Sequence, residues 1–305
     1  MKTMQMRTQH KLDLQELIQL CSTRLNHLFS SYLLNISSLE LKTAMQYTLL
    51  NNGKRLRPLL IYATGLTFGA TLDNLDLPAG AVELIHTYSL IHDDLPCMDN
   101  ADLRRGKLTC HKKFNEGIAV LTGDALHTLA MQIISAHPAT LKAEKRIKMM
   151  RQLSIACGPF GMAAGQALDI TVMNGSDLSI DLLENIYRLK TGCLFSACIE
   201  LGWLCSNDDD EKNHQALLHF GDCVGLAFQI QDDILDIESS SAEMGKTQGI
   251  DQINNKATFP KLLGLAAAKE KVSALYDEAL ETINYLGSQA DLLRELTTMM
   301  LGRKH

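Results

Sequence analysis

The chain has 305 residues, of which 46% are hydrophobic and 21% charged, and its formal net charge is -6. These proportions are typical of a globular protein with a substantial core, and the acidic balance argues against a nucleic-acid-binding protein. The eight cysteines are scattered singly, with no C-x-x-C pair and no grouping with histidine at zinc-ligand spacing. This pattern favours reduced thiols in a cytoplasmic protein over a disulfide scaffold or a zinc site.

Helical periodicity begins close to the N-terminus. Residues 1–20 mix polar and apolar types without an uninterrupted apolar core, so they predict a first helix and not a signal peptide. Within 13–29, leucines recur on one side of the predicted helix. The sequence contains no run of about 18 consecutive apolar residues, the length that a membrane span needs.

Similar helical patterns follow in chain order, and β-branched alternating runs are scarce. The segments with this pattern are 39–50, 77–91, 123–136, 145–158, 182–202, 214–237 and 268–286. Turn-forming sequences join them, and the composition stays even, without a repeat or a linker between domains. The sequence therefore predicts one all-α domain over residues 1–305, a bundle of about ten helices.

The first chemical feature is "LIHDDLPCMDN", which places Asp93, Asp94 and Asp99 around a proline. On a continuous helix Asp93 and Asp99 would point about 120° apart, so Pro96 predicts that the helix ends or is distorted there. His86, seven residues before Asp93, would share its helical face. The alternatives are a wet acidic turn or a cluster that binds a cation, because neighbouring carboxylates repel one another.

The second feature is "GLAFQIQDDILDI", an apolar helix with one polar stripe. Gln229, Asp232, Asp233 and Asp236 lie within about 60° of a common line at 3.6 residues per turn. A helix that is apolar nearly all round is buried, so this stripe must face a cavity, a cation or a partner. A solvated face would contain lysine or glutamate, and neither occurs in this segment. Two oxygen-rich clusters favour Mg²⁺, which binds carboxylates, water and substrate phosphate.

Basic residues accompany both clusters. A glycine turn before the first cluster and a short run after it supply Lys54, Arg55, Arg57, Arg104, Arg105 and Lys107. Three more lysines, two of them beyond the second cluster, are Lys190, Lys246 and Lys256. Either basic run alone is typical of a solvated patch. Beside aspartate clusters they indicate diphosphate anchors, because guanidinium groups bind phosphate oxygens in pairs.

The motifs G-K-R-x-R-P, D-D-x-x-x-x-D followed by L-R-R-G, K-T-G and F-Q-x-x-D-D-x-x-D occur here in that order. Over nearly the whole chain the sequence resembles the trans-prenyltransferases, and specifically the bacterial farnesyl diphosphate synthases. The resemblance implies an isoprenoid-synthase-type homodimer with a central cavity. It implies a cytoplasmic transferase that condenses isopentenyl diphosphate with dimethylallyl and geranyl diphosphate to farnesyl diphosphate, using two or three Mg²⁺ ions per subunit.

The resemblance also implies roles for the matching residues. The metal ligands would be Asp93, Asp94, Asp99, Asp232, Asp233 and Asp236. The allylic diphosphate would contact Arg104, Lys190, Lys246 and Lys256. Isopentenyl diphosphate would contact Lys54, Arg57, His86 and Arg105. The developing carbocation would lie near Thr191 and Gln229. One departure follows Asp99, where Asn100 and Ala101 replace the family's further aspartates; Asn100 can still accept a hydrogen bond from metal-bound water, so we expect activity to persist.

Product length should depend on the residues just before the first cluster. Helix geometry puts Ser89 about 40° from Asp93 and Tyr88 about 140° away. The resemblance instead implies that an aromatic residue at Tyr88 stops chain growth at fifteen carbons. The two criteria disagree, and the resemblance favours Tyr88.

Three other functions compete with this interpretation. A geranylgeranyl diphosphate synthase would share nearly every motif. A terpene cyclase would need no second diphosphate site, which both basic motifs argue against. A catalytically silent binding subunit should have lost aspartates from one cluster, and both clusters are complete.

Overall fold

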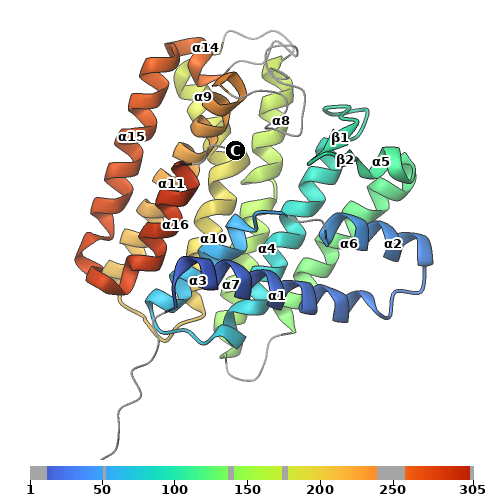
Figure 1. Ribbon diagram of the computed structural model, residues 1–305, viewed down its shortest axis with the longest axis horizontal. Helices are drawn as coiled ribbons and strands as arrows, with labels where there is room; N and C mark the ends of the chain where they lie inside the picture. The colour runs from blue at the N-terminus through green and yellow to red at the C-terminus, as the bar shows by residue number, and fades with distance from the viewer. Residues whose placement is uncertain (1–11, 51–52, 137–140, 174–177, 239–257, 303–305) are drawn as a thin grey trace, which may run out of the picture.

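The computed structural model describes residues 12–50, 53–136, 141–173, 178–238 and 258–302, and nearly all regular structure in these ranges is helical (Figure 1). The longer helices are α1 (Leu14–Leu33), α2 (Leu39–Leu49), α3 (Leu56–Thr67), α4 (Leu72–Asp93), α6 (Glu116–Ser135), α7 (Ala143–Cys157), α8 (Met162–Met173), α9 (Ile180–Tyr187), α10 (Cys193–Leu204), α11 (Glu211–Glu238), α15 (Leu265–Thr282) and α16 (Asp291–Leu301). The shorter elements are β1 (Leu103–Arg104), β2 (Lys107–Leu108), α5 (Cys110–Lys113), the π-helix η1 (Arg188–Gly192), α14 (Phe259–Leu263) and the 3₁₀ helix η2 (Asn284–Ala290).

The all-α prediction is confirmed, with twelve helices of eight or more residues in these ranges where about ten were expected. Local sequence sets several helix starts. Asp13 accepts a hydrogen bond from the Glu16 N–H, and Glu16 accepts one from the Asp13 N–H, which forms a capping box at α1. Asn115 caps α6 by accepting from the Ile118 N–H. The single domain over 1–305 stays a prediction.

Helix α10 occupies the middle of the bundle and packs against α3, α4, α7 and α11 (Figure 1). Its sequence "CLFSACIELGWL" is apolar nearly all round, and nine of its twelve residues are buried. Helix α3 is buried to a similar degree. Helix α3 was not among the segments expected from helical periodicity, although it is a regular helix of twelve residues.

Helix α4 carries the first aspartate cluster at its C-terminal end and extends further upstream than expected. The expected turn "DNLDLP" forms its first two turns, with Pro78 inside the helix. Arg24 of α1 donates hydrogen bonds to Asp73 and Asp76, and Tyr62 of α3 also donates to Asp76. These contacts from two neighbouring helices stabilise a helical start that local turn signals argue against.

The segment 182–202, expected as one helix, consists of α9, η1 and α10 in succession. Five residues of π-helix, "RLKTG", widen the turn at Lys190 and Thr191. Single π-turns inside helices are frequent at functional sites because the extra residue changes the direction of side chains. This irregularity lies at one of the predicted motifs.

One helix of the described residues, α6, is long and apolar enough to cross a membrane by length and composition alone. Its sequence contains polar residues such as Asp124, so it lacks the unbroken run of about 18 apolar residues that the sequence analysis required of a membrane span. Helix α6 packs against α4, α2 and α7, so its buried face is explained by the core of this bundle.

Candidate active site

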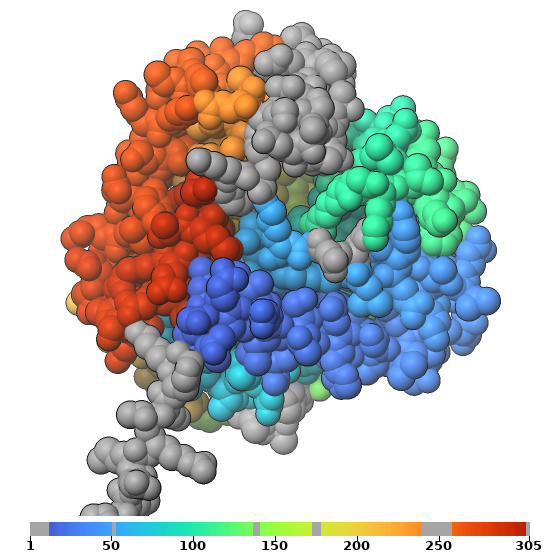
Figure 2. Space-filling view, viewed as in Figure 1, coloured from blue at the N-terminus to red at the C-terminus, as the bar shows by residue number. Residues whose placement is uncertain are grey.

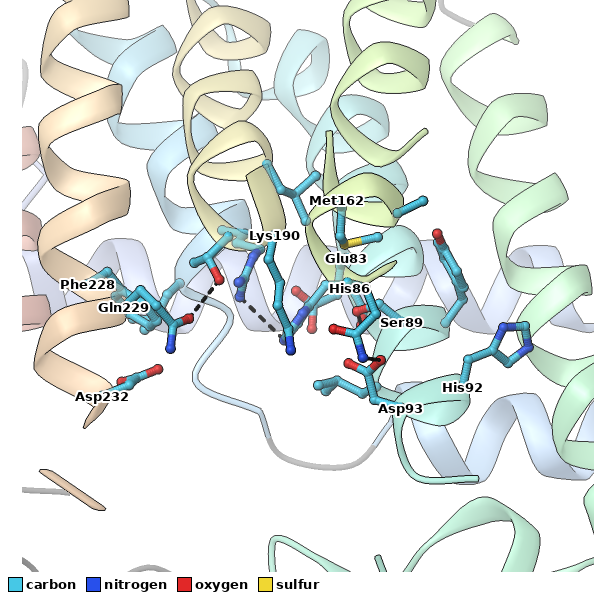
Figure 3. Close-up of a pocket in the computed structure, with 18 of the residues that line it drawn as sticks. Glu83, His86, Ser89, His92, Asp93, Met162, Lys190, Phe228, Gln229 and Asp232 are labelled. Atoms are coloured by element: carbon cyan, nitrogen blue, oxygen red, sulfur yellow. Dashed lines mark hydrogen bonds between the residues drawn. The ribbon is translucent and has the colours of Figure 1, made fainter. Parts of the chain in front are cut away.

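A cavity of about 850 Å³ lies between α3, α4, the β1–β2 hairpin, α8, η1, α10 and α11. The face shown in Figure 2 is hollowed between the light-blue start of α3 and the teal hairpin. Its volume lies within the range typical of small-molecule sites. Figure 3 shows Asp93 of α4 and Asp232 of α11 on opposite sides, with Lys190 and His86 between them.

The first aspartate cluster forms a turn at the end of α4. The helix ends at Asp93, before Pro96, as predicted. The Asp99 N–H then donates to the Asp93 carbonyl over 2.9 Å, and the Asn100 N–H donates to the Leu95 carbonyl over 3.0 Å. The chain therefore curls back and brings Asp99 to Asp93, which an unbroken helix would not allow.

Asp93 lines the cavity in a largely desolvated position. Burial raises its pKa from the usual 3.8 to about 6, with Lys190 opposing the shift and Asp99 adding to it. Gln166 Nε2 of α8 donates to Asp93 Oδ1 over 3.0 Å, and Gln166 Oε1 is buried with no hydrogen-bond partner among the described residues. A cation close to Asp93 would therefore stabilise its charged form and lower its pKa.

Asp94 takes a different direction from Asp93. It is 3% exposed and accepts hydrogen bonds from Arg104 Nε at 2.8 Å and from Arg104 Nη2 at 2.7 Å. This bidentate pair joins the end of α4 to β1, and of its two members only Arg104 lines the cavity. Asp94 therefore positions an arginine at the cavity wall in this structure.

The carboxylates of the second aspartate cluster also point in different directions. Of its three carboxylates, the cavity lining in the described part of the chain includes Asp232 but neither Asp233 nor Asp236. Asp233 is buried, where it accepts hydrogen bonds from the Tyr187 hydroxyl at 2.5 Å and from the Phe259 N–H at 3.2 Å. Asp233 thus ties α9 and α14 to α11.

Thr191 and Gln229, both predicted to lie near the developing carbocation, meet in the cavity. Thr191 Oγ1 donates to Gln229 Oε1 over 2.7 Å, across the contact between η1 and α11. A Cβ on Gly225, one turn before Gln229, would lie 2.7 Å from the Gly192 Cα. Only glycine allows the two elements to approach this closely.

Lys190 projects from η1 into the cavity and forms an ion pair with Asp169 of α8, with Nζ and Oδ2 2.6 Å apart. Asp169 is 8% exposed. Neither Asp169 nor Gln166 was singled out from the sequence. Their polar side chains, three residues apart in the apolar helix "MAAGQALDITVM", are a signal of the same kind as the stripe on α11.

Three further cations and one histidine line the cavity, namely Lys54, Arg57, Arg105 and His86. Arg57 Nη1 lies 3.4 Å from His86 Nε2 and its guanidinium lies over the Phe195 ring. Burial, followed by the nearby arginines, holds the pKa of His86 well below its usual value. The imidazole is therefore neutral and can accept from Arg57.

The two basic runs touch each other. A Cβ on Gly53 would lie 2.5 Å from Arg105 Nη1, so the glycine turn leaves room for an arginine from the hairpin. Arg105 and Gly106 both have positive φ, 53° and 73°, as a two-residue hairpin turn requires. The tight hairpin thereby directs the two adjacent arginines to the cavity wall.

Arg55 has a structural partner. Its Nη1 lies 2.5 Å from Glu83 Oε1, and the two residues are 8% and 3% exposed. It also donates to the Leu49 carbonyl. Removal of one partner of a buried ion pair lowers the free energy of unfolding by several kcal/mol. Arg55 thus anchors the segment after Gly53 that contains Lys54 and Arg57.

Tyr88 and Ser89 both line the cavity, so geometry does not choose between the two predicted length-determining residues. The Tyr88 ring makes edge contacts with His127 at 5.1 Å and with His92 at 5.7 Å between ring centroids. Ser89 Oγ donates to the His86 carbonyl over 2.9 Å. Tyr88 offers the larger obstruction, held in place by rings of two helices.

Two predicted residues, Lys246 and Lys256, lie outside the described residues. Within the described ranges, no three carboxylates of the two aspartate clusters approach within 4.8 Å of one another. The donor set is nevertheless that of a hard cation, because Asp93 and Asp232 offer oxygen atoms at the two sides of the cavity. Mg²⁺ keeps several waters and uses one or two carboxylates beside substrate phosphate, so these residues fit Mg²⁺ bound together with a diphosphate.

Comparison with known proteins agrees with this geometry. The farnesyl diphosphate synthase of Escherichia coli strain K12 is 45% identical over 282 residues, which cover 92% of this chain and 94% of that protein. The crystal structure of a geranyltransferase from Legionella pneumophila matches with a TM-score of 0.85 and 34% identity, over 95% of this chain and 96% of that one. A geranyltransferase from Helicobacter pylori, complexed with magnesium and isoprenyl diphosphate, matches with a TM-score of 0.80 and 35% identity, over 96% and 98% of the two chains.

Geranylgeranyl pyrophosphate synthases are also among the similar proteins. That of Catharanthus roseus is 42% identical over 246 residues, 80% of this chain and 68% of that protein. The predicted isoprenoid-synthase fold is confirmed by the solved structures. The family description that matches residues 38–293 is polyprenyl synthetase. The chain therefore belongs to the polyprenyl synthetase family, in which it is similar to bacterial farnesyl diphosphate synthases.

Proposed function

We propose that this chain is a prenyltransferase that joins isopentenyl diphosphate to dimethylallyl diphosphate and then to geranyl diphosphate, giving farnesyl diphosphate. The observation that supports it most is one cavity with Asp93 and Asp232 on opposite sides and cations of two separate basic runs at its walls. In this proposal the cations divide into one group for each diphosphate: Lys190 and Arg104 for the allylic one, and Lys54, Arg57 and Arg105 for isopentenyl diphosphate. A terpene cyclase would leave the second group without a ligand.

The allylic diphosphate belongs beside Asp93, Asp232 and Lys190 in this proposal. Two or three Mg²⁺ ions, held by Asp93, Asp99 and Asp232, would supply positive charge that lets diphosphate leave. Lys190, oriented by Asp169, adds a fixed positive charge on the same side. Asp236 lies one helical turn beyond Asp232 and would become a further Mg²⁺ ligand when the substrate is bound.

Asp94 and Asp233 take positioning roles in this proposal. Asp94 holds Arg104 at the cavity wall, and Asp233 fixes the end of α11 through Tyr187. Both oxygens of Asp94 accept hydrogen bonds from Arg104, so its negative charge is already compensated. A direct metal contact for either residue would require those hydrogen bonds to break.

Isopentenyl diphosphate belongs at the other basic group, beside Lys54, Arg57 and Arg105. The neutral His86 can accept from Arg57 and turn its guanidinium toward a phosphate oxygen. Binding here would direct the double bond toward C1 of the allylic substrate. In this proposal the released diphosphate accepts the proton that is lost in the final elimination, so this step uses no protein base.

Carbon–carbon bond formation needs a shielded cation between the two diphosphates. The Thr191–Gln229 pair presents oxygen atoms to this region, and Phe228 adds an aromatic face. Oriented dipoles of this kind stabilise developing positive charge without solvent reorganisation. The chain's own contribution is therefore orientation, electrostatic stabilisation and exclusion of water.

Product analysis tests this function directly. Purified protein is incubated with isopentenyl diphosphate, dimethylallyl diphosphate and Mg²⁺, and the alcohols released by phosphatase are identified. A C15 product is expected, whereas C20 as the main product would favour the geranylgeranyl diphosphate synthase. No product from folded protein would favour the silent subunit.

An aspartate pair provides the matched control. Asp93→Ala should abolish turnover with an unchanged circular dichroism spectrum. Asp102→Ala removes a carboxylate nine residues further on that pairs with Lys112 at the surface, and it should leave turnover close to that of the unmodified protein. Retained activity in Asp93→Ala would contradict the metal assignment.

A homodimer in the cytoplasm is part of the same proposal. Exposed apolar side chains on α6 and α7, namely Val120, Leu121 and Ile147, support a surface that a second copy would cover. Light scattering coupled to gel filtration measures the mass, and Leu121→Glu should shift a dimer toward monomer. A monomeric unmodified protein would contradict this part of the proposal.

A further inference from the structure

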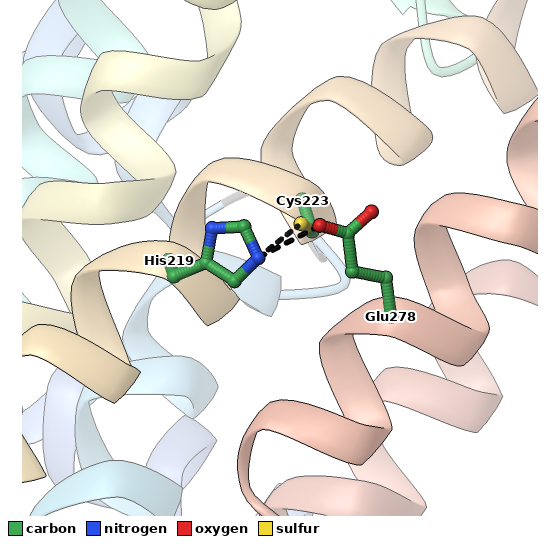
Figure 4. Close-up of side chains that lie close together, drawn as sticks. All are labelled: His219, Cys223 and Glu278. Atoms are coloured by element: carbon green, nitrogen blue, oxygen red, sulfur yellow. Dashed lines mark hydrogen bonds and ion pairs between the residues drawn. The ribbon is translucent and has the colours of Figure 1, made fainter.

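Three potential metal ligands meet on the outer side of α11, away from the cavity. His219 and Cys223 are four residues apart on that helix and lie on one face, and Glu278 reaches them from α15 (Figure 4). Among the described residues this is the one group of three His, Cys, Asp or Glu side chains whose ligand atoms all lie within 4.8 Å of one another. It shares no residue with the cavity lining.

The distances come close to those of a tetrahedral zinc site. Cys223 Sγ lies 3.8 Å from His219 Nε2, and His219 Nε2 lies 2.8 Å from Glu278 Oε1. Ligand bonds of about 2.0–2.3 Å at tetrahedral angles require about 3.6 Å between sulfur and nitrogen and about 3.4 Å between nitrogen and oxygen. An ion would therefore need the His219–Glu278 contact to open by about half an ångström, which two half-exposed side chains permit.

The surroundings favour a cation with access from solvent. The side chains of His219 and Glu278 are 51% and 53% exposed, while Cys223 is buried beneath them. Asp222, next to Cys223, adds a carboxylate beside the group, and Arg188 pairs with both Asp222 and Glu184. A water molecule can complete the fourth position from the exposed side.

We propose that His219, Cys223 and Glu278 form a binding site for Zn²⁺ that ties α11 to α15. Imidazole and thiolate ligands select a borderline transition metal over Mg²⁺, so this site is chemically distinct from the two aspartate clusters. This proposal departs from the sequence-based expectation that no cysteine and histidine stand at zinc-ligand spacing. The H-x-x-x-C pair is helical ligand spacing, and the third ligand is 59 residues from His219, where no local pattern reveals it.

The location gives the ion a defined physical effect. Helix α15 packs along α11, and α11 continues from this site to Asp232 at the cavity. An ion bound to both helices stabilises the folded chain, because the unfolded chain does not hold the three ligands together. At a Zn²⁺ concentration about 100 times the Kd, Tm should rise by about 5 °C.

Cobalt substitution tests the site without reference to activity. Untagged protein, freed of metal with EDTA and kept in excess Mg²⁺ and inorganic diphosphate to occupy the aspartate clusters, is titrated with Co²⁺ and then Zn²⁺. We expect one Co²⁺ per chain, with an absorption band from cobalt–thiolate charge transfer that Zn²⁺ abolishes. Cys223→Ser should remove the band, and His219→Ala and Glu278→Gln should each weaken binding at least tenfold.

A second cysteine supplies the control. Cys97 is exposed and lies in the first aspartate cluster, so Cys97→Ser should leave the cobalt band intact. The two surface variants His219→Ala and Glu278→Gln keep the test valid if Cys223→Ser fails to fold, which circular dichroism reveals. No thiolate band in the unmodified protein, or a band that persists in His219→Ala and Glu278→Gln at unchanged affinity, would overturn the proposal.

Discussion

Replacing Asp93 with asparagine tests the electrostatics of the cavity in the absence of metal and substrate. The amide is nearly isosteric with the carboxylate and still offers an oxygen to Gln166, whose Nε2 donates to Asp93 Oδ1 over 3.0 Å. The substitution therefore removes the ability to ionise while it keeps the shape and the principal contact. Any pH dependence that the substitution abolishes belongs to the Asp93 carboxyl.

The magnitude follows from the pKa of Asp93. Burial raises this pKa from 3.8, its value in the unfolded chain, to about 6 in the folded protein. Between about pH 4 and pH 6 the folded state holds a proton that the unfolded state has lost, so stability falls as pH rises. About two pKa units at 1.36 kcal/mol each give a loss of at most about 3 kcal/mol. Asparagine cannot ionise, so Asp93→Asn should gain up to this amount relative to the unmodified protein between pH 4 and pH 7.

Urea unfolding followed by circular dichroism, in EDTA at several pH values from 4 to 7, measures the free energy of unfolding of both proteins. Their difference should grow with pH and reach a plateau above the pKa. Asp99→Asn, which removes an exposed carboxylate of the same turn, should show a smaller change. A difference that is constant over this range, or that shrinks as pH rises, would refute the reasoning about burial.

Three further predictions concern the cavity walls. Tyr88→Ala should lengthen the product from C15 toward C20 by opening the cavity floor, and an unchanged product distribution in the alcohol assay would remove Tyr88 from this role. Arg55→Met should lower the free energy of unfolding by about 3–5 kcal/mol, because it leaves the buried Glu83 unpaired; urea unfolding measures this, and a loss below about 1 kcal/mol would show that the pair is unimportant. Gly53→Ala should raise the KM for isopentenyl diphosphate roughly tenfold, the equivalent of one weakened charged hydrogen bond, because the new methyl displaces Arg105. Steady-state kinetics test this last prediction, and an equal rise in the KM of the allylic substrate would argue against a selective effect.

The motifs that carry the chemistry could be recognised from the sequence. One aspartate group stood at the end of an apolar helix and the other within one, and neighbouring carboxylates in such surroundings favour a bound cation. Pro96 marked the end of a helix, and α4 does end just before it. These features depend on residues close together in the chain, where helical periodicity and proline stereochemistry act directly.

Directions of individual side chains within those motifs depended on distant partners. Asp94 and Asp233 belong to the same acidic stretches as Asp93 and Asp232, yet each points to a protein partner: Asp94 to Arg104 and Asp233 to Tyr187. Adjacent residues on a helix differ by about 100° in direction, and which of two neighbours meets the cavity depends on how the helix is packed.

The all-helical class, the family and most of the charged groups of the site could be predicted from the residues alone, because these follow from residue types at short spacings. The packing of the helices showed that Gln166 of α8 lines the cavity, that Asp169 of α8 pairs with Lys190, and that Glu278 meets His219 and Cys223. Those contacts join helices far apart in the chain. The physical reason is that local periodicity specifies which face of a helix is buried, whereas the packing of helices specifies what that face meets.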